Sequence, residues 1–197
     1  MLFRSGTTIP LVGPVSPPSD LVVESGTVLD AGPQTLTLGG DLTILSSARL
    51  RMTDPAGVVT VGGNATFAGA DMNDVTMTAG VLDLKGNLTT TVTSFTAFRA
   101  AGTHLTRFSG TALQTIYFYY PAVTQSRFQR VEITNPAGVE LQSNVIAFGD
   151  VALTGSAVLS ENGARTFSVG GLLTTGAGTA LNVSTLTVLN EIGRAHV

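Results

Sequence analysis

The sequence predicts an all-β protein, a right-handed parallel β-helix (β-solenoid) with coils of about 21–23 residues, and two observations lead to this prediction. The first is a strand-like phrase that ends in glycine followed by Asp or Asn, with that glycine at Gly40, Gly63 and Gly86. Since 63 − 40 = 86 − 63 = 23, the phrase has a fixed period, which is typical of stacked repeats. The second is the alternation of apolar and polar residues, as at Leu36 and Leu38, which indicates half-buried strands.

A β-sandwich is the alternative fold. Its hairpin turns recur about every 8–12 residues without a fixed long period, so the observed period favours the solenoid. The pairs Gly39–Gly40 and Gly62–Gly63 are expected to supply the positive φ angles of sharp corners. The phrase returns at Gly149, and 149 − 86 = 63 equals 3 × 21. We therefore expect three whole coils between Gly86 and Gly149.

The chain of 197 residues divides into three expected segments. Residues 1–20 hold four prolines, a density that argues against a central strand, and we interpret them as a Pro-rich lead-in or linker. Residues 21–190 are the predicted β-solenoid, of roughly seven coils. Ile192–Val197 reads IGRAHV, which resembles the translation of a sequencing adapter. We therefore interpret 191–197 as a non-native tail and the chain as a fragment of a longer protein.

Composition argues against several classes of protein. The charged fraction is 12% and the net charge is −3, so there is no basic field to attract nucleic acid. The absence of cysteine excludes disulfides and cysteine-ligated metals. No run approaches the roughly 20 apolar residues of a membrane span, so we expect no membrane insertion by this segment. The first residues lack the apolar core of a signal peptide, so an export signal is expected outside the fragment.

The alternation continues where the repeated phrase is less clear, so inward side chains can be assigned there as well. In the middle of the chain they are expected at Ile116, Phe118, Val131, Ile133, Val139 and Leu141. Near the C-terminus they are expected at Leu181, Val183, Leu186 and Val188. These assignments predict a continuous apolar interior along the solenoid.

Four short phrases resemble those of known proteins. They are GTALQTI (Gly110–Ile116), VEITN (Val131–Asn135), AGV (Ala137–Val139) and GDVAL (Gly149–Leu153). This wording resembles the repetitive β-solenoid segments of large bacterial surface proteins, adhesin-like or autotransporter-passenger-like. The resemblance covers about two-thirds of the chain and implies an extracellular or cell-surface location. It carries over no catalytic residue.

Few residues are suited to catalysis. His196 falls in the interpreted tail, and His104 lies beside a turn, so we expect His104 to be a surface or corner residue rather than a general base. The acidic cluster Asp71–Asp74 lacks the spacing of a calcium-binding loop and is expected to form a turn. No catalytic residue, metal or cofactor is therefore predicted.

Asp and Asn recur at one position of the repeat, at Asp41, Asn64, Asn87 and Asp150. Because the two residue types interchange there, we interpret the position as a corner requirement rather than a set of ligands. The glycosylation-like triplets that begin at Asn64, Asn87 and Asn182 are interpreted in the same way.

One unusual surface is predicted around the aromatic run that precedes two arginines. In an alternating strand Phe118 points inward, which leaves Tyr117 and Tyr119 pointing outward. Together with Arg127 and Arg130 they form a candidate ligand-binding patch, because exposed tyrosines near arginines are common at sugar and protein contacts. The competing interpretation is that these side chains only cover the edge of the core where the repeat loosens.

The predicted function is that of a non-enzymatic structural or adhesive segment of a secreted or cell-surface bacterial protein. Its expected partners are glycans or the surface proteins of a host or neighbour. The alternatives are a β-helical polysaccharide-active enzyme (a lyase or hydrolase) and a glycan-binding module. An enzyme should gather several charged side chains in a groove, whereas a stalk should scatter them. End-to-end self-association is also expected, because an open terminal coil leaves unpaired strand edges.

Overall fold

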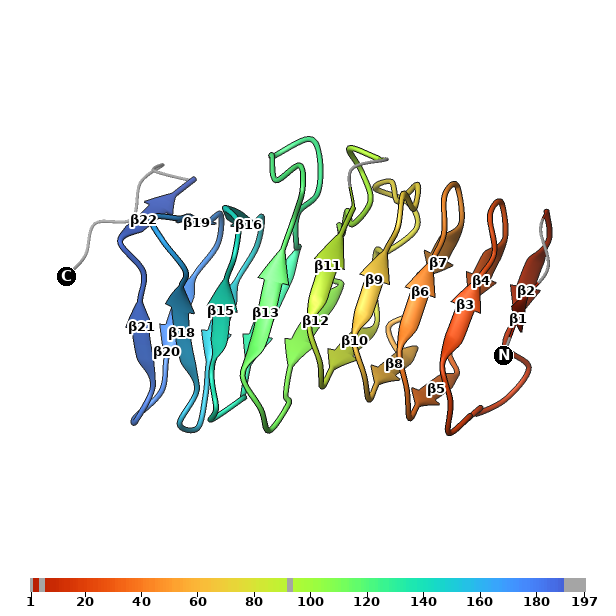
Figure 1. Ribbon diagram of the computed structural model, residues 1–197, viewed down its shortest axis with the longest axis horizontal. Helices are drawn as coiled ribbons and strands as arrows, with labels where there is room; N and C mark the ends of the chain where they lie inside the picture. Colours follow the sequence, from red (N-terminus) through yellow and green to blue (C-terminus); the bar gives the residue numbers. More distant parts are fainter. Residues whose placement is uncertain (1, 4–5, 92–93, 190–197) are drawn as a thin grey trace.

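The computed structural model describes residues 2–3, 6–91 and 94–189, which form one β-solenoid of about eight turns (Figure 1). Its strand pairings are parallel. A β-sandwich built from hairpins would pair its strands antiparallel, so that alternative is excluded. The described residues contain no helix, and hence none that could cross a membrane. The interpreted tail, 191–197, lies outside the described residues.

Each full turn runs along three faces, and two of them are continuous sheets. The nine-stranded long sheet consists of β1 (Leu2–Phe3), β3 (Leu21–Val23), β6 (Leu42–Ile44), β9 (Ala65–Phe67), β11 (Leu88–Thr90), β13 (Gln114–Tyr117), β15 (Val139–Leu141), β18 (Val158–Glu161) and β21 (Ala180–Asn182). The seven-stranded second sheet consists of β5 (Thr35–Leu38), β8 (Val58–Val61), β10 (Val81–Leu84), β12 (Leu105–Phe108), β14 (Arg130–Ile133), β17 (Val151–Leu153) and β20 (Leu173–Thr175).

The third face lies between the end of each long-sheet strand and the start of the next second-sheet strand. Toward the N-terminus it holds β2 (Thr8–Pro10), β4 (Val28–Asp30) and β7 (Arg49–Arg51). Toward the C-terminus it holds β16 (Val145–Ala147), β19 (Thr166–Val169) and β22 (Thr185–Val188). Between these two sheets the described pairing continues as isolated bridges, Met52–Met77, Arg99–Arg127 and Phe128–Ala147. The longer loops in Figure 1 project beside this interrupted part.

Coil length is regular toward the ends and greater in the middle. Successive register partners in the long sheet differ in residue number by 42 − 21 = 21, 65 − 42 = 23 and 88 − 65 = 23. The next differences are 116 − 88 = 28 and 141 − 116 = 25, and the last are 159 − 139 = 20 and 181 − 159 = 22. The predicted length is therefore right for the regular coils, while the middle coils carry insertions.

The prediction of three whole coils between Gly86 and Gly149 is wrong. Gly86 lies just before β11 in the long sheet, whereas Gly149 lies just before β17 in the second sheet. The two glycines therefore occupy different corners, and the stretch between them does not make a whole number of turns. The same short sequence motif can form any of the three corners of a turn. Two similar motifs therefore need not occupy equivalent corners.

Residues 6–20, interpreted from their prolines as a lead-in or linker, lie against the following turn. β2 pairs with β4, and Val15 forms a bridge with Leu36. Pro10 ends β2, the edge strand of its sheet, where a missing backbone N–H removes no ladder hydrogen bond. The nine strands of the long sheet are joined by 9 − 1 = 8 coil-to-coil steps. Seven of these steps lie between β3 and β21, within the segment predicted to be the solenoid.

The interior is apolar, with larger side chains in the longer coils. The inward residues predicted for the middle of the chain, from Ile116 to Leu141, are all buried. At the centre of this region the ring centroid of Phe98 lies 5.0 Å from that of Phe67, 5.6 Å from Phe118 and 5.3 Å from Phe128. These buried rings pack against one another in the core of the lengthened coils.

The residues predicted to point inward near the C-terminus are less buried than those in the middle, although Leu181, Leu186 and Val188 share register with the buried residues Leu159, Phe167 and Val169. Leu181 and Val183 are half-buried, whereas Leu186 and Val188 are exposed. Both exposed residues belong to the last described turn, on which no further described turn stacks.

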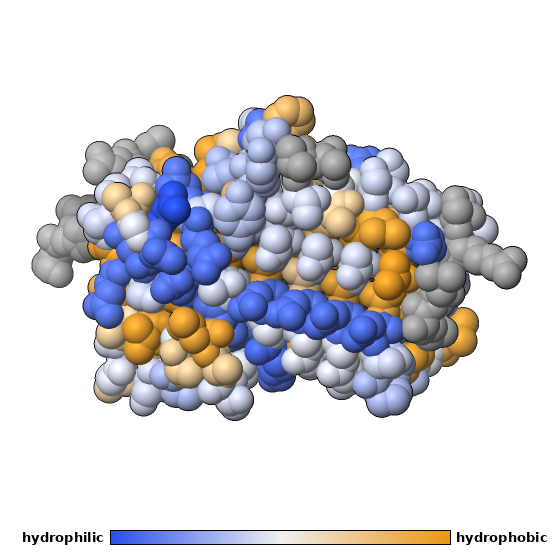
Figure 2. All heavy atoms as spheres, in the orientation of Figure 1, coloured by the Kyte–Doolittle hydropathy of each residue, from blue (hydrophilic) through white to orange (hydrophobic). Residues whose placement is uncertain are grey.

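A ladder of Asp and Asn side chains follows the corner before the long sheet. At each step a side-chain oxygen accepts a hydrogen bond from the backbone N–H at the same place in the next coil. The steps are Asp20 to Asp41 (2.8 Å), Asp41 to Asn64 (2.6 Å), Asn64 to Asn87 (3.0 Å) and Asn87 to Thr115 (2.8 Å). Asp150 does the same for Leu172 (2.8 Å) at the corner before the second sheet. Figure 2 shows a hydrophilic band crossing several coils on the face drawn there.

The glycines beside this ladder permit close approach of one coil to the next. A Cβ atom on Gly63 would lie 2.1 Å from the Asp41 Oδ1 atom, and one on Gly86 would lie 2.4 Å from the Gly63 carbonyl oxygen. Neither distance is tolerable for a side chain. The expectation that the glycine pairs supply positive φ is wrong, because Gly40 and Gly63 both have ordinary negative or extended backbone angles.

Replacement of Asn64 by alanine tests the ladder. The Asn87 N–H would lose its acceptor, and we expect the free energy of unfolding to fall by about 1 kcal/mol. The variant Asn64→Asp keeps the acceptor oxygen for the Asn87 N–H but places a second carboxylate beside that of Asp41, to which the Asn64 amide donates at 3.5 Å. It should therefore be less stable than the parent protein but more stable than Asn64→Ala. Urea denaturation provides the measurement, and identical midpoints for Asn64→Ala and Asn64→Asp would contradict the ladder's role.

Candidate functional site

The lengthened coils bring four aromatic side chains together near the corner between the long sheet and the third face. These are Phe95, from the loop after β11, and Tyr117, Tyr119 and Tyr120, at and after the end of β13. Ring centroids lie 4.4 Å apart for Phe95 and Tyr120, 4.7 Å for Tyr120 and Tyr119, and 6.4 Å for Tyr119 and Tyr117. We call this group the aromatic row. Its rings are tilted or edge-on to one another, so they present both faces and edges to a ligand.

Hydroxyl groups of largely buried side chains hold the two loops that carry the aromatic row. The Tyr119 N–H donates to the Thr90 hydroxyl oxygen at 2.9 Å. Ser126 joins the two loops, because its hydroxyl donates to the Phe95 carbonyl at 3.3 Å and accepts from the Phe98 N–H at 3.4 Å. Because Thr90 and Ser126 are both buried, these hydrogen bonds tie the two loops to the core and so position the row.

Two members of the aromatic row are unusually exposed for rings that already contact one another. Phe95 has a relative exposure of 58% and Tyr119 of 43%, while Tyr117 and Tyr120 are half-buried. Exposed rings can stack on the apolar faces of sugar rings, and the phenol hydroxyls can hydrogen-bond to sugar hydroxyls. The aromatic row thus presents ring faces and hydroxyl groups that a ligand could contact.

The structure brings only half of the predicted patch together. Tyr117 and Tyr119 are neighbours, and Phe118 points inward as predicted. Arg127 was expected on the surface with them but is buried, with only 6% of its surface exposed. Its guanidinium donates to the Asp74 carboxylate at 2.8 Å and to the Val123 carbonyl at 2.7 Å. Arg127 therefore anchors the loop that carries the tyrosines instead of offering a free cation to a ligand.

Arg130 lies in β14 on the second sheet, away from the long-sheet strand that ends at Tyr117. It lines a shallow hollow together with Arg107, Glu132 and Asp150. The Arg107 Nε–H donates to Glu132 at 2.5 Å. The Asp150 carboxylate accepts from the Leu172 N–H. Both carboxylates of this hollow thus have partners within the fold.

Sequence reasoning missed Phe95, and it placed Tyr120 in the unusual aromatic run without including it in the candidate patch. Tyr120 follows directly after Tyr119, so the run of aromatic residues itself was a usable signal. Phe95 lies about one coil before Tyr120 in the chain. The two residues meet because both lie in inserted loops. Where the sequence repeat is no longer recognisable, the lengths of these insertions cannot be read from the sequence.

Ion pairs that join different coils are distributed along the stack. Five ion pairs between described residues join different coils: Asp30–Arg51 (2.5 Å), Arg49–Asp71 (2.6 Å), Asp74–Arg99 (2.5 Å), Asp74–Arg127 (2.8 Å) and Arg107–Glu132 (2.5 Å). The Arg51 guanidinium holds the pKa of Asp30 below its ordinary value through their hydrogen bond. An exposed ion pair contributes about 0–1 kcal/mol to the free energy of unfolding. Because each of these pairs joins different coils, together they favour one coil-to-coil register.

The acidic cluster Asp71–Asp74 forms a turn, as expected. Asn73 accepts a hydrogen bond from the Val75 N–H at 3.2 Å through its side-chain oxygen, and arginines from neighbouring coils pair with Asp71 and Asp74. Within the described part of the chain no group of three or more His, Asp or Glu side chains could hold a metal ion.

His104 follows a turn, as predicted, but it is buried rather than at the surface. Its Nδ1 lies 2.9 Å from the Ala79 carbonyl oxygen, which fixes the tautomer with the proton on Nδ1. The buried Nε2 has no hydrogen-bond partner. Burial lowers the pKa of His104 to about 4, because the charged imidazolium would lose its hydration. The residue is a neutral part of the core.

No protein-family model, no curated protein and no solved structure matches the chain. By its geometry the chain is a parallel β-solenoid whose lengthened middle coils carry an aromatic row.

Burial of His104 predicts a specific loss of stability in acid. Between the ordinary histidine pKa of about 6.5 and the folded pKa of about 4, the unfolded chain binds a proton that the folded chain does not. The free energy of unfolding should therefore fall as the pH decreases through this window, by about 3 kcal/mol in total.

The variant His104→Gln lacks this titration and tests the assignment. Urea denaturation of both proteins at several pH values from about 7 to about 4 gives the two stability profiles. We expect the difference between them to shrink or reverse as the pH falls. Parallel profiles would contradict a neutral buried imidazole.

Proposed function

We propose that the chain is a non-enzymatic structural and adhesive segment of a secreted or cell-surface protein, and that its aromatic row contacts glycans. The observation that carries the proposal is the aromatic row itself, exposed at Phe95 and Tyr119 and held by Thr90 and Ser126. Inserted loops of solenoid repeats often form the binding face. The row lies in the lengthened coils, where the steps between register partners rise to 116 − 88 = 28 and 141 − 116 = 25.

A mechanical role is supported by the way in which each coil is joined to its neighbours. Parallel hydrogen bonds, the Asp and Asn ladder, a continuous core and ion pairs all act along the same axis. A solenoid of this kind resists bending, and backbone held in sheets is a poor protease substrate because cleavage requires local opening. The resemblance to bacterial surface proteins is consistent with this role, which makes a bacterial cell-surface origin part of the proposal.

A neutral glycan is the ligand best suited to the row. The nearest arginine on this loop, Arg127, is already engaged by Asp74 and Val123 and is not free to bind an anionic group. Stacking on aromatic rings and hydrogen bonding to phenol hydroxyls require no ligand charge.

A polysaccharide-active enzyme is the second candidate, and one observation favours it. The hollow on the second sheet gathers Arg107, Arg130, Glu132 and Asp150, the grouping of charges expected of such an enzyme. Release of new reducing ends from neutral and acidic polysaccharides, present in the parent protein and lost in Glu132→Gln, would support this candidate over the non-enzymatic one.

The glycan proposal predicts measurable binding that depends on Tyr119. We expect immobilised neutral oligosaccharides of glucose, galactose, mannose or N-acetylglucosamine to retain the parent protein. Tyr119→Ala should bind roughly fivefold more weakly, since a stacking ring contributes on the order of 1 kcal/mol. Tyr119→Phe keeps the ring and should retain most of the affinity.

The control is Val75→Ala, because Val75 is an exposed apolar residue outside the aromatic row. Its affinity should equal that of the parent protein. If no oligosaccharide binds, or if Tyr119→Ala and Val75→Ala bind equally well, the aromatic row is not a glycan site.

A further inference from the structure

Asp74 lies at the centre of a charge cluster that joins three coils on the third face. Its carboxylate accepts a hydrogen bond from the Arg99 guanidinium at 2.5 Å through Oδ2, and one from the Arg127 guanidinium at 2.8 Å through Oδ1. The two arginines are register partners in successive coils. Among the described residues no other carboxylate pairs with either of them. One carboxylate is therefore the counter-ion of two stacked cations.

Arg127 is the arginine that depends most on this carboxylate. Its side chain is only 7% exposed, compared with 22% for Arg99. The Phe148 ring covers the guanidinium, whose carbon atom lies 5.1 Å from the ring centroid. A buried charge that loses its partner is strongly destabilising, because neither water nor another charge compensates it. Without the Asp74 carboxylate, the Arg127 side chain would have to move toward water.

The loop that carries Tyr119 and Tyr120 is built around the Arg127 side chain. We call residues 119–126 the tyrosine loop. It is closed by the Ser126 N–H, which donates to the Tyr120 carbonyl at 3.1 Å. Near its middle the Val123 carbonyl accepts a hydrogen bond from the Arg127 guanidinium at 2.7 Å. Because this guanidinium joins Asp74 to the tyrosine loop, a displacement of Arg127 would also displace the loop.

The turn that carries Asp74 is fixed by contacts of its own. The buried Thr76 hydroxyl donates to the Asn73 carbonyl at 2.9 Å and accepts from the Asn73 N–H at 3.1 Å. The Thr76 carbonyl accepts from the Met52 N–H of the preceding coil at 2.7 Å. None of these contacts involves the tyrosine loop, so the turn can hold Asp74 in place while the loop is positioned against it.

We propose that Asp74 is a positioning residue of the aromatic row. Its carboxylate holds Arg127, Arg127 holds the tyrosine loop, and the loop sets the 4.4 Å contact between Tyr120 and Phe95. A row that is held in this way meets a glycan without rearrangement, which lowers the entropic cost of binding. The inference rests on the proposed glycan-binding function, which it extends to a turn two coils earlier in the chain.

Substitution of Asp74 by asparagine tests the proposal, and Asp71 provides the matched control. Asp71 lies in the same turn, has a similar side-chain exposure (48% against 46%) and pairs with Arg49 at 2.6 Å. Asp74→Asn should bind the immobilised neutral oligosaccharides roughly fivefold more weakly than the parent protein, whereas Asp71→Asn should bind them like the parent. Asp74→Glu keeps the carboxylate and should retain most of the affinity. Equal affinities of Asp74→Asn and Asp71→Asn would overturn the proposal.

A double-mutant cycle separates positioning from a general loss of stability. If Asp74 acts through the aromatic row, Asp74→Asn should weaken binding by a smaller factor in the Tyr119→Ala background than in the parent protein. A substitution that only lowers the folded fraction would weaken binding by the same factor in both backgrounds. That result would overturn the positioning role.

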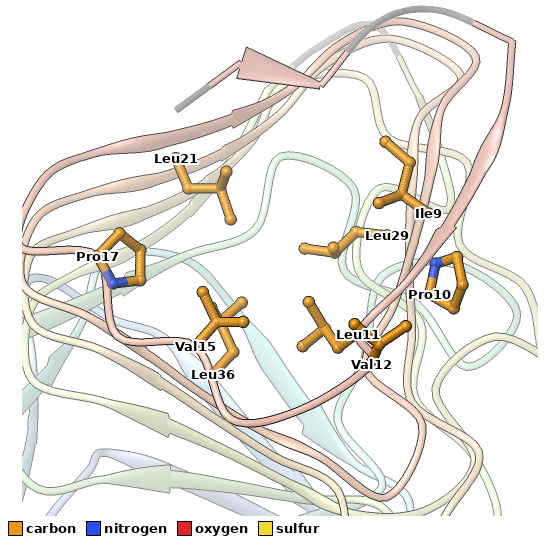
Figure 3. A pocket seen from close by; sticks show the side chains of 9 residues that line it. All are labelled: Ile9, Pro10, Leu11, Val12, Val15, Pro17, Leu21, Leu29 and Leu36. Carbon is orange, nitrogen blue, oxygen red and sulfur yellow. The ribbon is translucent and has the colours of Figure 1, made fainter.

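Hydrogen exchange of backbone amides tests the tyrosine loop without any glycan. The Ser126 amide, whose hydrogen bond closes the loop, should exchange faster in Asp74→Asn than in the parent protein and in Asp71→Asn. The Leu21 amide provides the reference, because it bonds to the Asp41 carbonyl at 2.8 Å in a residue that lines the apolar pocket at the first turn (Figure 3). It should exchange alike in all three proteins. Unchanged exchange at Ser126 would contradict the proposal.

The two kinds of measurement also separate this inference from the proposed function. A parent protein that binds no oligosaccharide overturns the adhesive function, while exchange of the Ser126 amide still decides whether Asp74 positions the loop. A parent protein that binds glycans no better than Asp74→Asn does overturns only the positioning role.

Discussion

The parallel hydrogen bonding of one coil to the next is the interaction on which the rest of this structure depends. Neighbouring strands lie roughly 4.8 Å apart, so every residue meets its counterpart from the next turn at that distance. Apolar side chains must stack on apolar ones, as Leu21 on Leu42. Corner residues must satisfy the next backbone N–H, as Asp41 does for Asn64. Gly63 is required where a Cβ atom would meet the preceding turn.

The same constraint explains which parts of the fold could be predicted from the sequence. Where coils are equal in length, stacking forces equivalent residues into a fixed period, and the corner at Gly40, Gly63 and Gly86 shows it. Inward positions such as Ile116 and Leu141 follow from the alternation alone, even where the period is lost. Gly149 was misplaced because the three corners of a turn make the same physical demands and hence use similar residues.

The candidate site was less predictable, since it is built from the residues that depart from the repeat. Alternation correctly separated Tyr119 from Phe118, but it could not bring Phe95 beside Tyr120 across two inserted loops. Arg127 was misassigned because its partner, Asp74, lies 53 residues and two coils earlier in the chain. His104 follows an exposed turn, yet its side chain points into the core. Insertions are where a solenoid can vary without breaking its stack, and they are also where a local pattern ceases to be informative.

Deletion of one whole coil is the most direct test of coil-on-coil stacking. Removing residues 42–64 joins Asp41 to Ala65 and leaves β3 facing β9 in the register that β6 had with each of them. Stacking predicts a folded, shorter solenoid with a β-sheet circular dichroism spectrum and cooperative unfolding in urea. Removing only residues 42–53 leaves part of a turn and should prevent folding. If the two deletions behave alike, coil-to-coil register does not determine this fold.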